Sequence, residues 1–369
     1  MQNFNISSKK ELKKFIENKG FKKILILAGK RSFNLSGLKN FFSEVKSNEL
    51  KFYFKEKPFP DYEELLLIIN EINRYSPDLI IAAGGGSVLD YAKIANVINQ
   101  EDNLSEKIIS NNYKLKNNNR KLIAIPTTAG SGAEVTANAV IYINNVKYSV
   151  EGQLIKPDDF FLIPDFIKGA SNKIKSSAGF DAISQSIESL ISLKSNDDSV
   201  KYATRSLEIS LKYFLNFLSN PNLENTSAMA FAANLSGRAI SISKTTAPHA
   251  VSYPFTSLFN ISHGHAVSLT LDKFMTFNYK NLKKNKSNFD LKKRYEILFN
   301  LSKSNNIEEF QFFLNNLQKK AQLENNFTNL GININNSIDR ILNDVNEQRL
   351  SNNPIQIDKQ IIKKILIEN

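Results

Sequence analysis

Short, unbroken apolar segments alternate with helix-like segments along the first 165 residues, and this alternation is the strongest constraint on the fold. Strands are predicted at residues 23–28, 51–54, 78–83 and 121–125, and helices at residues 9–18, 62–74 and 88–98. Strand–helix alternation at this spacing indicates βαβ units and a parallel sheet. Because the strands are apolar throughout, we expect a sheet that is covered on both faces.

The pattern changes after Pro164. Helical periodicity dominates residues 181–322, and strand-like segments become scarce there. The segment 155–164 contains two prolines and is the expected junction. We therefore predict an α/β domain over residues 1–162 and an all-α domain over residues 163–369.

Composition narrows the class of protein. The chain has no Cys, which excludes disulfides, thiolate metal sites and a cysteine nucleophile. Its net charge is +12, but the lysines are spread along the chain and form no basic groove pattern, so no nucleic-acid partner is expected. The apolar runs are far shorter than the ~20 residues of a membrane span. The N-terminus lacks the apolar core of a signal peptide. We expect a cytoplasmic protein with a small-molecule substrate and no membrane partner.

A glycine-rich loop follows the third predicted strand. Residues 84–87 read Gly-Gly-Gly-Ser and lead into the next predicted helix. Glycines let the backbone approach a ligand where a Cβ would clash, and a helix N-terminus offers N–H groups to a phosphate. The segment is not the G-x-G-x-x-G fingerprint, because position 89 is Leu, and a tight turn without a ligand is the alternative. Its place at the carboxyl end of a parallel strand favours ligand binding.

A second polar loop follows the fourth predicted strand. Residues 126–136 contain four hydroxyl side chains and two glycines. This composition suits recognition of a ribose, a phosphate or a carboxamide. Taken alone, it also fits an ordinary turn rich in Ser and Thr.

The three histidines of the chain all fall within residues 249–265. Upstream, Asp181, Gln185 and Glu188 share one face of a predicted helix, and apolar residues occupy the opposite face. The polar face and the histidines together indicate a candidate metal site. The alternative is a solvated helix face with ordinary surface histidines.

Taken together and in this order, these segments resemble the iron-containing (group III) alcohol dehydrogenases. The matching segments are GGGSVLDYAK at 84–93, PTTAGSGAEVT at 126–136, DAISQSIES at 181–189, and the block 249–266. The resemblance covers essentially the whole chain. It implies a dehydroquinate synthase-like fold, with a parallel-sheet α/β dinucleotide-binding domain followed by an all-α domain that binds metal and substrate. A homodimer is expected by the same analogy.

The resemblance also implies a set of metal ligands: an Asp, a His four residues later, and two His fourteen residues apart. Three residues match this set: Asp181, His249 and His263. Gln185 stands where most members have the first His and is predicted as a fourth ligand through its carbonyl oxygen, so both Fe²⁺ and Zn²⁺ are considered. Tyr253 stands where many members have a further His, and we predict Tyr253 and His265 as catalytic groups. For Tyr253 the alternative is an aromatic wall, and for His265 it is an indirect or surface role.

Two segments, 244–254 and 349–354, are similar to the phosphonoacetaldehyde reductase-like branch of this family. A dianionic phosphonate substrate needs cations near the metal. Arg238 and Lys244 lie just before His249 in the sequence and are predicted to bind the substrate anion. The alternative is that either residue belongs to a structural ion pair.

The end of the first strand bears on the choice of cofactor. Many NAD-using members have an acidic residue there, whereas this chain has Gly29, Lys30 and Arg31. We therefore predict NADP(H), with NAD(H) as the other possibility and two solvated loop cations as the alternative reading. The full predicted cofactor-binding set is Gly29, Lys30, Gly85, Gly86, Ser87, Asp90, Thr127, Thr128, Ser131, Val135 and Lys147.

The predicted activity is hydride transfer between a nicotinamide cofactor and a small, anionic aldehyde such as phosphonoacetaldehyde. The sequence is also compatible with four alternatives. They are oxidation of a sugar-like alcohol in surface-polysaccharide synthesis, a dehydroquinate synthase-like lyase, a basic nucleic-acid-binding protein, and a non-catalytic relative, the last because of Gln185.

Overall fold

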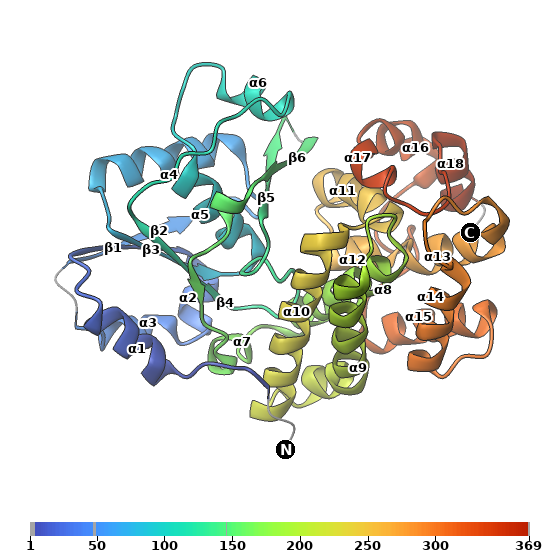
Figure 1. Ribbon diagram of the computed structural model, residues 1–369, viewed down its shortest axis with the longest axis horizontal. Helices are drawn as coiled ribbons and strands as arrows, with labels where there is room; N and C mark the ends of the chain where they lie inside the picture. Colours follow the sequence, from blue (N-terminus) through green and yellow to red (C-terminus); the bar gives the residue numbers. More distant parts are fainter. Residues whose placement is uncertain (1–3, 47–48, 145, 368–369) are drawn as a thin grey trace. The chain divides into compact units, whose positions relative to one another are not determined.

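The computed structural model describes residues 4–46, 49–144 and 146–367. The chain divides into two compact units (Figure 1). The first unit comprises Met1–Ser171 and Pro221–Asn234, and the second comprises Asn172–Asn220 and Leu235–Asn369. Helix α10 (Leu223–Ser243) therefore contributes its first part to one unit and its second part to the other.

The first unit is built on a parallel sheet of five strands in the order β2-β1-β3-β4-β7. The strands are β1 (Lys23–Gly29), β2 (Glu49–Lys55), β3 (Leu79–Gly84), β4 (Lys121–Pro126) and β7 (Asp159–Phe160). After β2 the chain crosses to the other side of β1 to form β3. The carboxyl ends of β1 and β3 therefore mark the switch point at which open α/β sheets bind ligands.

Helices cover both faces of this sheet, as the apolar strands predict. Side chains alternate between the faces of a strand. In β1, Leu25 and Leu27 pack in one buried cluster with residues of α4 and α5, while Ile24 and Ile26 pack in another cluster with residues of α1 and α3. The helices of this unit are α1 (Lys9–Asn18), α2 (Lys30–Leu35), α3 (Leu38–Ser43), α4 (Tyr62–Tyr75), α5 (Gly86–Val97), α6 (Leu104–Ile109), α7 (Pro164–Ile167) and the 3-10 turn η1 (Gln153–Ile155).

Several elements of this unit have no counterpart among the predicted strands and helices. They are the short helices α2, α3, α6 and α7, the turn η1, the edge strand β7 and a hairpin. Strands β5 (Asn138–Ile143) and β6 (Val146–Glu151) form an antiparallel hairpin, and α5 packs against β5. The sequence does carry a signal for it. Two short segments rich in β-branched and aromatic residues flank two asparagines, and the first of these, Asn144, has a left-handed φ of 52°.

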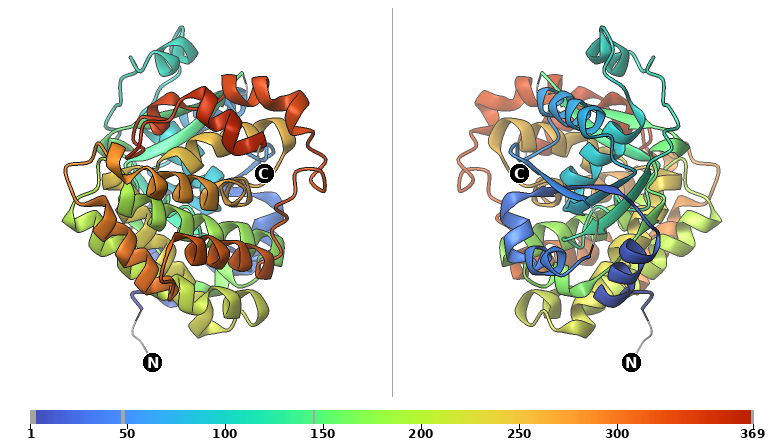
Figure 2. Two further views of the ribbon diagram at one scale, coloured as in Figure 1. Left: turned by 90° about the vertical axis from the view of Figure 1, so that its right-hand side faces the viewer. Right: turned by 90° about the vertical axis from the view of Figure 1, so that its left-hand side faces the viewer.

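The second unit is helical in its described residues, as predicted for an all-α domain (Figure 2). Its elements, besides the end of α10, are α8 (Asn172–Ile191), α9 (Asp197–Ser219), α11 (Ala247–Phe259), α12 (His263–Ser268), α13 (Leu271–Lys280), η2 (Leu282–Lys284), α14 (Leu291–Ser302), α15 (Ile307–Lys320), α16 (Ile334–Asn343), α17 (Glu347–Leu350) and α18 (Lys359–Ile367).

Helix α8 is the centre of the second unit, because almost every residue from Lys175 onward is buried. Its small serines let neighbouring helices approach closely and pair with serines there. Ser186 Oγ donates to Ser206 Oγ of α9 at 2.8 Å, and Ser243 Oγ of α10 donates to Ser189 Oγ at 2.8 Å. The polar face that the sequence assigns to this helix is therefore buried in the unit rather than solvated.

Within the described residues, none of the helices combines the length and the apolar character that crossing a membrane requires.

Candidate metal centre and cofactor loops

Three potential metal ligands from three helices meet in the second unit. Asp181 comes from α8, His249 from α11 and His263 from α12, and one ligand atom of each lies within 4.8 Å of the others. Asp181 Oδ1 is 3.3 Å from His249 Nε2. Donor atoms about 2.1 Å from a tetrahedral metal are about 3.4 Å apart. One carboxylate and two imidazoles at this spacing fit a divalent cation in both distance and donor chemistry.

Gly264 allows α12 to lie directly against α8. A Cβ at this position would be 1.9 Å from the backbone oxygen of Ser177 and 2.8 Å from the Cβ of Asp181. Any larger residue would therefore push the two helices apart. Because His263 is the preceding residue, this contact is what brings its ring to Asp181.

The carboxylate of Glu188 fixes the ring of His249. Glu188 is fully buried, and one of its oxygens pairs with Nδ1 of His249. Its other oxygen accepts hydrogen bonds from the backbone N–H and the hydroxyl of Thr246, at 2.7 and 2.8 Å. A carboxylate at Nδ1 leaves Nε2 facing Asp181, which is the arrangement that orients metal-binding imidazoles. Burial lowers the pKa of His249, but the charges of Glu188 and Asp181 outweigh it and raise this pKa to about 9.

Gln185 lies one helical turn after Asp181 on α8 and is buried. Its Oε1, the atom predicted to bind metal, accepts a hydrogen bond from Ser236 Oγ of α10 at 3.0 Å. The structure therefore gives this amide a defined partner on another helix. The role of Gln185 as a metal ligand stays a prediction.

The structure gives the two predicted catalytic residues different surroundings. The ring of Tyr253 stacks on His263 with centroids 5.6 Å apart, so Tyr253 borders the three ligands. Burial raises the pKa of Tyr253, and a hydrogen bond from Thr245 opposes this rise only in part. His265 instead contacts the backbone oxygen of Glu324 through Nε2 at 2.6 Å, and burial lowers its pKa. Catalytic roles for both residues stay predictions, and the geometry favours Tyr253.

The two predicted substrate cations lie at the end of α10. Arg238 follows Ser236 by two residues, which places it about 200° around the helix from the side that meets Gln185. Lys244 follows the last helical residue and has a left-handed φ of 62°. These placements give no support to an anion-binding role, which stays a prediction for both.

In the first unit, the structure brings the two predicted cofactor loops together. Gly84 of β3 is paired with Pro126 of β4, so both loops leave the same edge of the sheet. A Cβ on Gly86 would lie 2.9 Å from Ser131 Oγ, and a Cβ on Gly85 would lie 3.5 Å from Thr128. The glycine-rich loop thus packs backbone against the hydroxyl-rich loop. Helix α5 begins at Gly86, two residues earlier than predicted.

Thr127 carries an unsatisfied hydroxyl at this edge. The residue is only 3% exposed, and its Oγ1 has no hydrogen-bond partner within the part of the chain that the structure describes. Its backbone N–H donates to the oxygen of Gly84 at 2.9 Å, which fixes the residue beside the glycine loop. A buried hydroxyl without a partner is unfavourable, which favours a cofactor role for Thr127, and that role stays a prediction.

Lys93 is a structural residue that sequence reasoning missed. It is fully buried in α5, and its ammonium donates to Ala133 O at 2.9 Å, Thr136 Oγ1 at 2.7 Å and Asn138 O at 2.6 Å. These bonds tie the hydroxyl-rich loop to α5. A single lysine among the apolar residues of this helix was the available signal, because a buried lysine needs acceptors for its charge.

The other predicted cofactor residues lie at several places in the first unit. Gly29 and Lys30 are at the carboxyl end of β1, and the side chains of Lys30 and Arg31 are exposed. Val135 is buried. Asp90, on α5, lies near Lys147 of β6 and accepts a hydrogen bond from the N–H of Val140 of β5. The cofactor roles of these residues stay predictions.

The charge of Asp90 leads to a testable pH dependence. Burial raises the pKa of Asp90 to about 6, from 3.8, although Lys93, Lys147 and the N–H of Val140 oppose this rise. A raised carboxyl pKa stabilises the fold below the unfolded value, and this contribution is lost as the pH rises through 6. As the pH rises from about 4 to about 7, the free energy of unfolding of Asp90→Asn is therefore expected to increase by about 2–3 kcal/mol relative to that of wild type.

Urea unfolding of both proteins across this pH range measures the difference. Asp102→Asn is the control, because Asp102 is exposed. Parallel stability curves for wild type and Asp90→Asn would contradict the buried-charge interpretation.

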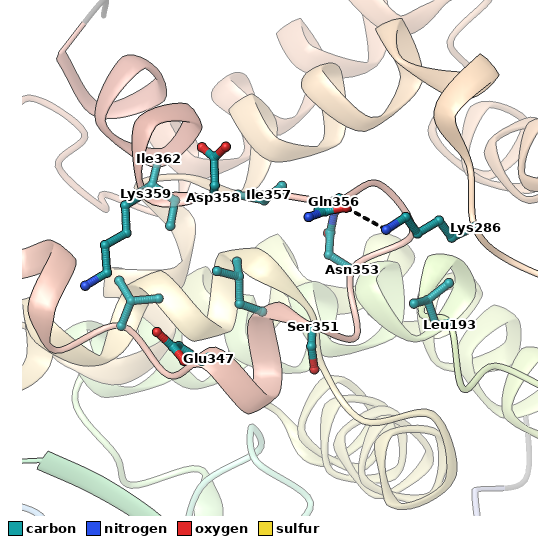
Figure 3. A pocket seen from close by; sticks show the side chains of 12 residues that line it. Leu193, Lys286, Glu347, Ser351, Asn353, Gln356, Ile357, Asp358, Lys359 and Ile362 are labelled. Atoms are coloured by element: carbon teal, nitrogen blue, oxygen red, sulfur yellow. Dashed lines mark hydrogen bonds between the residues drawn. The ribbon is translucent and has the colours of Figure 1, made fainter.

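A cavity of about 420 Å³ lies beside α17 and α18 in the second unit (Figure 3). The polar groups at its wall include Glu347, Asp358 and Lys359, and Lys286 Nζ donates to Gln356 Oε1 at 2.6 Å. None of the three candidate metal ligands lines it. The cavity is therefore separate from the metal centre.

Comparison with known proteins gives curated relatives of modest identity. The phosphonoacetaldehyde reductase of Streptomyces viridochromogenes is 26% identical over 59% of this chain and 57% of that protein. The 4-hydroxybutyrate dehydrogenase of Clostridium kluyveri is 29% identical over 60% of this chain and 61% of that protein. The chain thus spans less than two thirds of both relatives. The NADPH-dependent butanol dehydrogenase of Clostridium saccharobutylicum is 25% identical over 94% of this chain and 91% of that protein.

Solved structures show the same fold over the whole length. A sulfoacetaldehyde reductase from Bifidobacterium kashiwanohense, solved in complex with NAD+, has a TM-score of 0.86 at 22% identity and covers 99% of this chain and 95% of its own. An alcohol dehydrogenase from Oenococcus oeni also has a TM-score of 0.86, at 20% identity, over 99% of this chain and 97% of its own. The predicted combination of a parallel-sheet domain and an all-α domain is confirmed.

Two family models together cover most of the chain. The model for iron-containing alcohol dehydrogenase matches residues 3–164, and the model for the C-terminal part of the Fe-containing alcohol dehydrogenase family matches residues 175–369. These matches confirm the resemblance seen in the sequence motifs, and a phosphonoacetaldehyde reductase is among the relatives. The chain belongs to the iron-containing alcohol dehydrogenase family.

Proposed function

We propose that the protein is a metal-dependent, NAD(P)-linked alcohol dehydrogenase that reduces a small anionic aldehyde such as phosphonoacetaldehyde. The observation that carries the proposal is the meeting of Asp181, His249 and His263, from three helices, in a member of this family. Their spacing suits a divalent cation. Family membership favours this activity over a dehydroquinate synthase-like lyase and over a nucleic-acid-binding protein.

Asp181, His249 and His263 would hold Fe²⁺ or Zn²⁺, and when bound this cation would polarise the carbonyl group of the substrate as a Lewis acid. Glu188 keeps His249 in the tautomer whose Nε2 can bind the cation. Tyr253 stays protonated near neutral pH because burial raises its pKa. Its hydroxyl can therefore donate a hydrogen bond or a proton to the substrate oxygen as negative charge develops there.

The first unit would bind the dinucleotide. We assign its diphosphate to Gly85, Gly86 and Ser87, because the loop lies at the switch point of the sheet and its glycines present bare backbone. Thr127 and the neighbouring hydroxyls would contact the nicotinamide and its ribose. The unsatisfied hydroxyl of Thr127 supports this assignment.

Relatives of this chain support an anionic substrate. Two curated relatives and one solved structure are named for phosphonoacetaldehyde, 4-hydroxybutyrate and sulfoacetaldehyde, each of which carries an acidic group. A butanol dehydrogenase is also a relative, over nearly the whole chain. A short neutral alcohol is therefore the second candidate substrate, and the homodimer stays a prediction.

The decisive experiment is an aldehyde panel. The purified full chain is loaded with Fe²⁺ or Zn²⁺ and assayed with phosphonoacetaldehyde, sulfoacetaldehyde, succinic semialdehyde and butanal, following oxidation of the reduced nicotinamide. We expect metal-dependent reduction, with the highest kcat/KM for phosphonoacetaldehyde. Absence of turnover with every aldehyde, and with the corresponding alcohols in reverse, would reject the proposed activity.

We predict that NADPH is preferred over NADH by about tenfold or more in kcat/KM. No carboxylate follows β1, and Lys30 and Arg31 are exposed at its carboxyl end, where they can bind a 2′-phosphate. Lys30→Asp is expected to remove most of this preference, whereas Lys39→Asp, at an exposed position on α3, is expected to leave it unchanged. A strong NADH preference in wild type would contradict the prediction.

A further inference from the structure

We propose that Arg349 binds the acidic group of the substrate. The inference rests on the proposed function and deepens it by naming the residue that selects aldehydes carrying a phosphonate, sulfonate or carboxylate. Arg349 is half-buried in the one-turn helix α17. It was not among the candidate cations of the sequence, which were Arg238 and Lys244.

Two asparagines hold α17 in a fixed position. At its start, Asn346 Oδ1 accepts a hydrogen bond from the backbone N–H of Arg349 at 2.8 Å. Just after its end, the buried Nδ2 of Asn352 donates to Ser192 Oγ at 2.8 Å and to the backbone oxygens of Ser243 and Thr245, both at 2.9 Å. Arg349 is thus anchored to the segment that leads into α11, the helix of His249.

The anchored segment leads directly to the metal centre. Helix α17 packs against α11. Thr245, which Asn352 holds, bonds the hydroxyl of Tyr253, whose ring stacks on His263. After burial, the charge of Arg349 is the largest influence on the pKa of Tyr253, and the charge of Asp181 acts on the same hydroxyl. The residue after Thr245, Thr246, binds the carboxylate of Glu188 that holds His249, so α17 ends close to the metal centre.

One side of α17 faces the cavity between α17 and α18, and Arg349 lies on the other side. Glu347, Leu350 and Ser351 line the cavity beside α17 and α18, and Arg349 does not (Figure 3). On a helix, Arg349 lies about 200° around from Glu347, so we expect its side chain on the other side of α17 from that cavity. Helix α17 also packs against α11.

The chemistry of this position favours an arginine. Asp181 and Glu188 place two carboxylates at the centre, and an anionic substrate needs a compensating cation there. A guanidinium is charged at any working pH and can bind two oxygens of a phosphonate, sulfonate or carboxylate at once. An ammonium is a point charge without this forked geometry.

The test compares wild type with Arg349→Gln and Arg349→Lys. Arg340→Gln is the matched control, because Arg340 is exposed on α16. The kcat/KM ratio of each anionic aldehyde to butanal is measured. Calorimetry gives the Kd of phosphonoacetate, an unreactive anion, for the full chain loaded with Zn²⁺ and NADPH. We expect the ratio to fall about 100-fold in Arg349→Gln and about tenfold in Arg349→Lys, with a matching rise in Kd and no change in the control.

Several results would overturn the assignment. They are an unchanged ratio in Arg349→Gln, equal losses on anionic and neutral aldehydes, or a fall in the ratio only in Arg238→Gln or Lys244→Gln. If Arg349→Gln does not fold, the kcat/KM ratio and the Kd of Arg349→Lys are compared with those of wild type instead. If wild type reduces no aldehyde, the proposed function fails, and calorimetry still decides the anion site. Weaker phosphonoacetate binding in the Arg349 variants alone supports it, and equal binding refutes it.

Discussion

Replacing Asp181 with alanine is expected to abolish metal binding and to lower kcat/KM by at least about a thousandfold. Asp181 supplies the single carboxylate among the three candidate ligands, from a helix that is buried along most of its length. Two imidazoles alone would hold a divalent cation weakly. Elemental analysis of the purified variant and steady-state kinetics after reconstitution with Fe²⁺ or Zn²⁺ measure the two effects.

Asp198→Ala is the control for this experiment, because Asp198 lies in the same unit on α9 and its side chain is 70% exposed. This variant is expected to keep its metal and its activity. If Asp181→Ala turned over aldehyde at the wild-type rate without metal, the centre would have no catalytic role.

Gly264→Ala is expected to cause the second largest effect, a loss of about 3 kcal/mol or more in the free energy of unfolding together with loss of the metal. The added Cβ would overlap the backbone oxygen of Ser177 at 1.9 Å, and a backbone atom cannot rotate away. Helix α12 must therefore move off α8, and His263 moves with it. Urea unfolding and metal content of the purified variant measure both consequences.

Ser262→Ala is the matched control, because Ser262 is exposed at the start of the same helix and makes no side-chain cap bond. It is expected to change stability by less than about 0.5 kcal/mol. Wild-type stability and metal content in Gly264→Ala would show that the two helices can separate without disturbing the ligands.

The sequence predicts the four main strands and the three longest helices of the first unit because their signals are local. Apolar runs of strand length, the glycine loop and the helices between them are each readable within a few residues, and the parallel sheet follows from their alternation. The hairpin of β5 and β6 was missed although its strands are as long as β3 and β4 and rich in β-branched and aromatic residues. Its packing against α5 depends on contacts that no local pattern shows.

The candidate site is less accessible to sequence reasoning, since its parts are far apart in the chain. Asp181 and His249 are 68 residues apart, and motif resemblance rather than spacing brought them together. Residues such as Gly264 and Lys93 take their meaning from the backbone they touch, which only the folded chain defines. The cations Arg238 and Lys244 were chosen by nearness in sequence, whereas folding packs α17, which carries Arg349 a hundred residues after His249, against α11.

The serine-lined packing of α8 affects how readily the metal ligands separate when the fold opens locally. Segments that open most readily are those with few buried contacts, and α8 is enclosed almost along its whole length. Helix α12 is buried at five of its six residues and lies directly against α8 at Gly264. Asp181 and His263 therefore belong to one tightly packed helix pair, and we expect them to separate only when the unit itself unfolds.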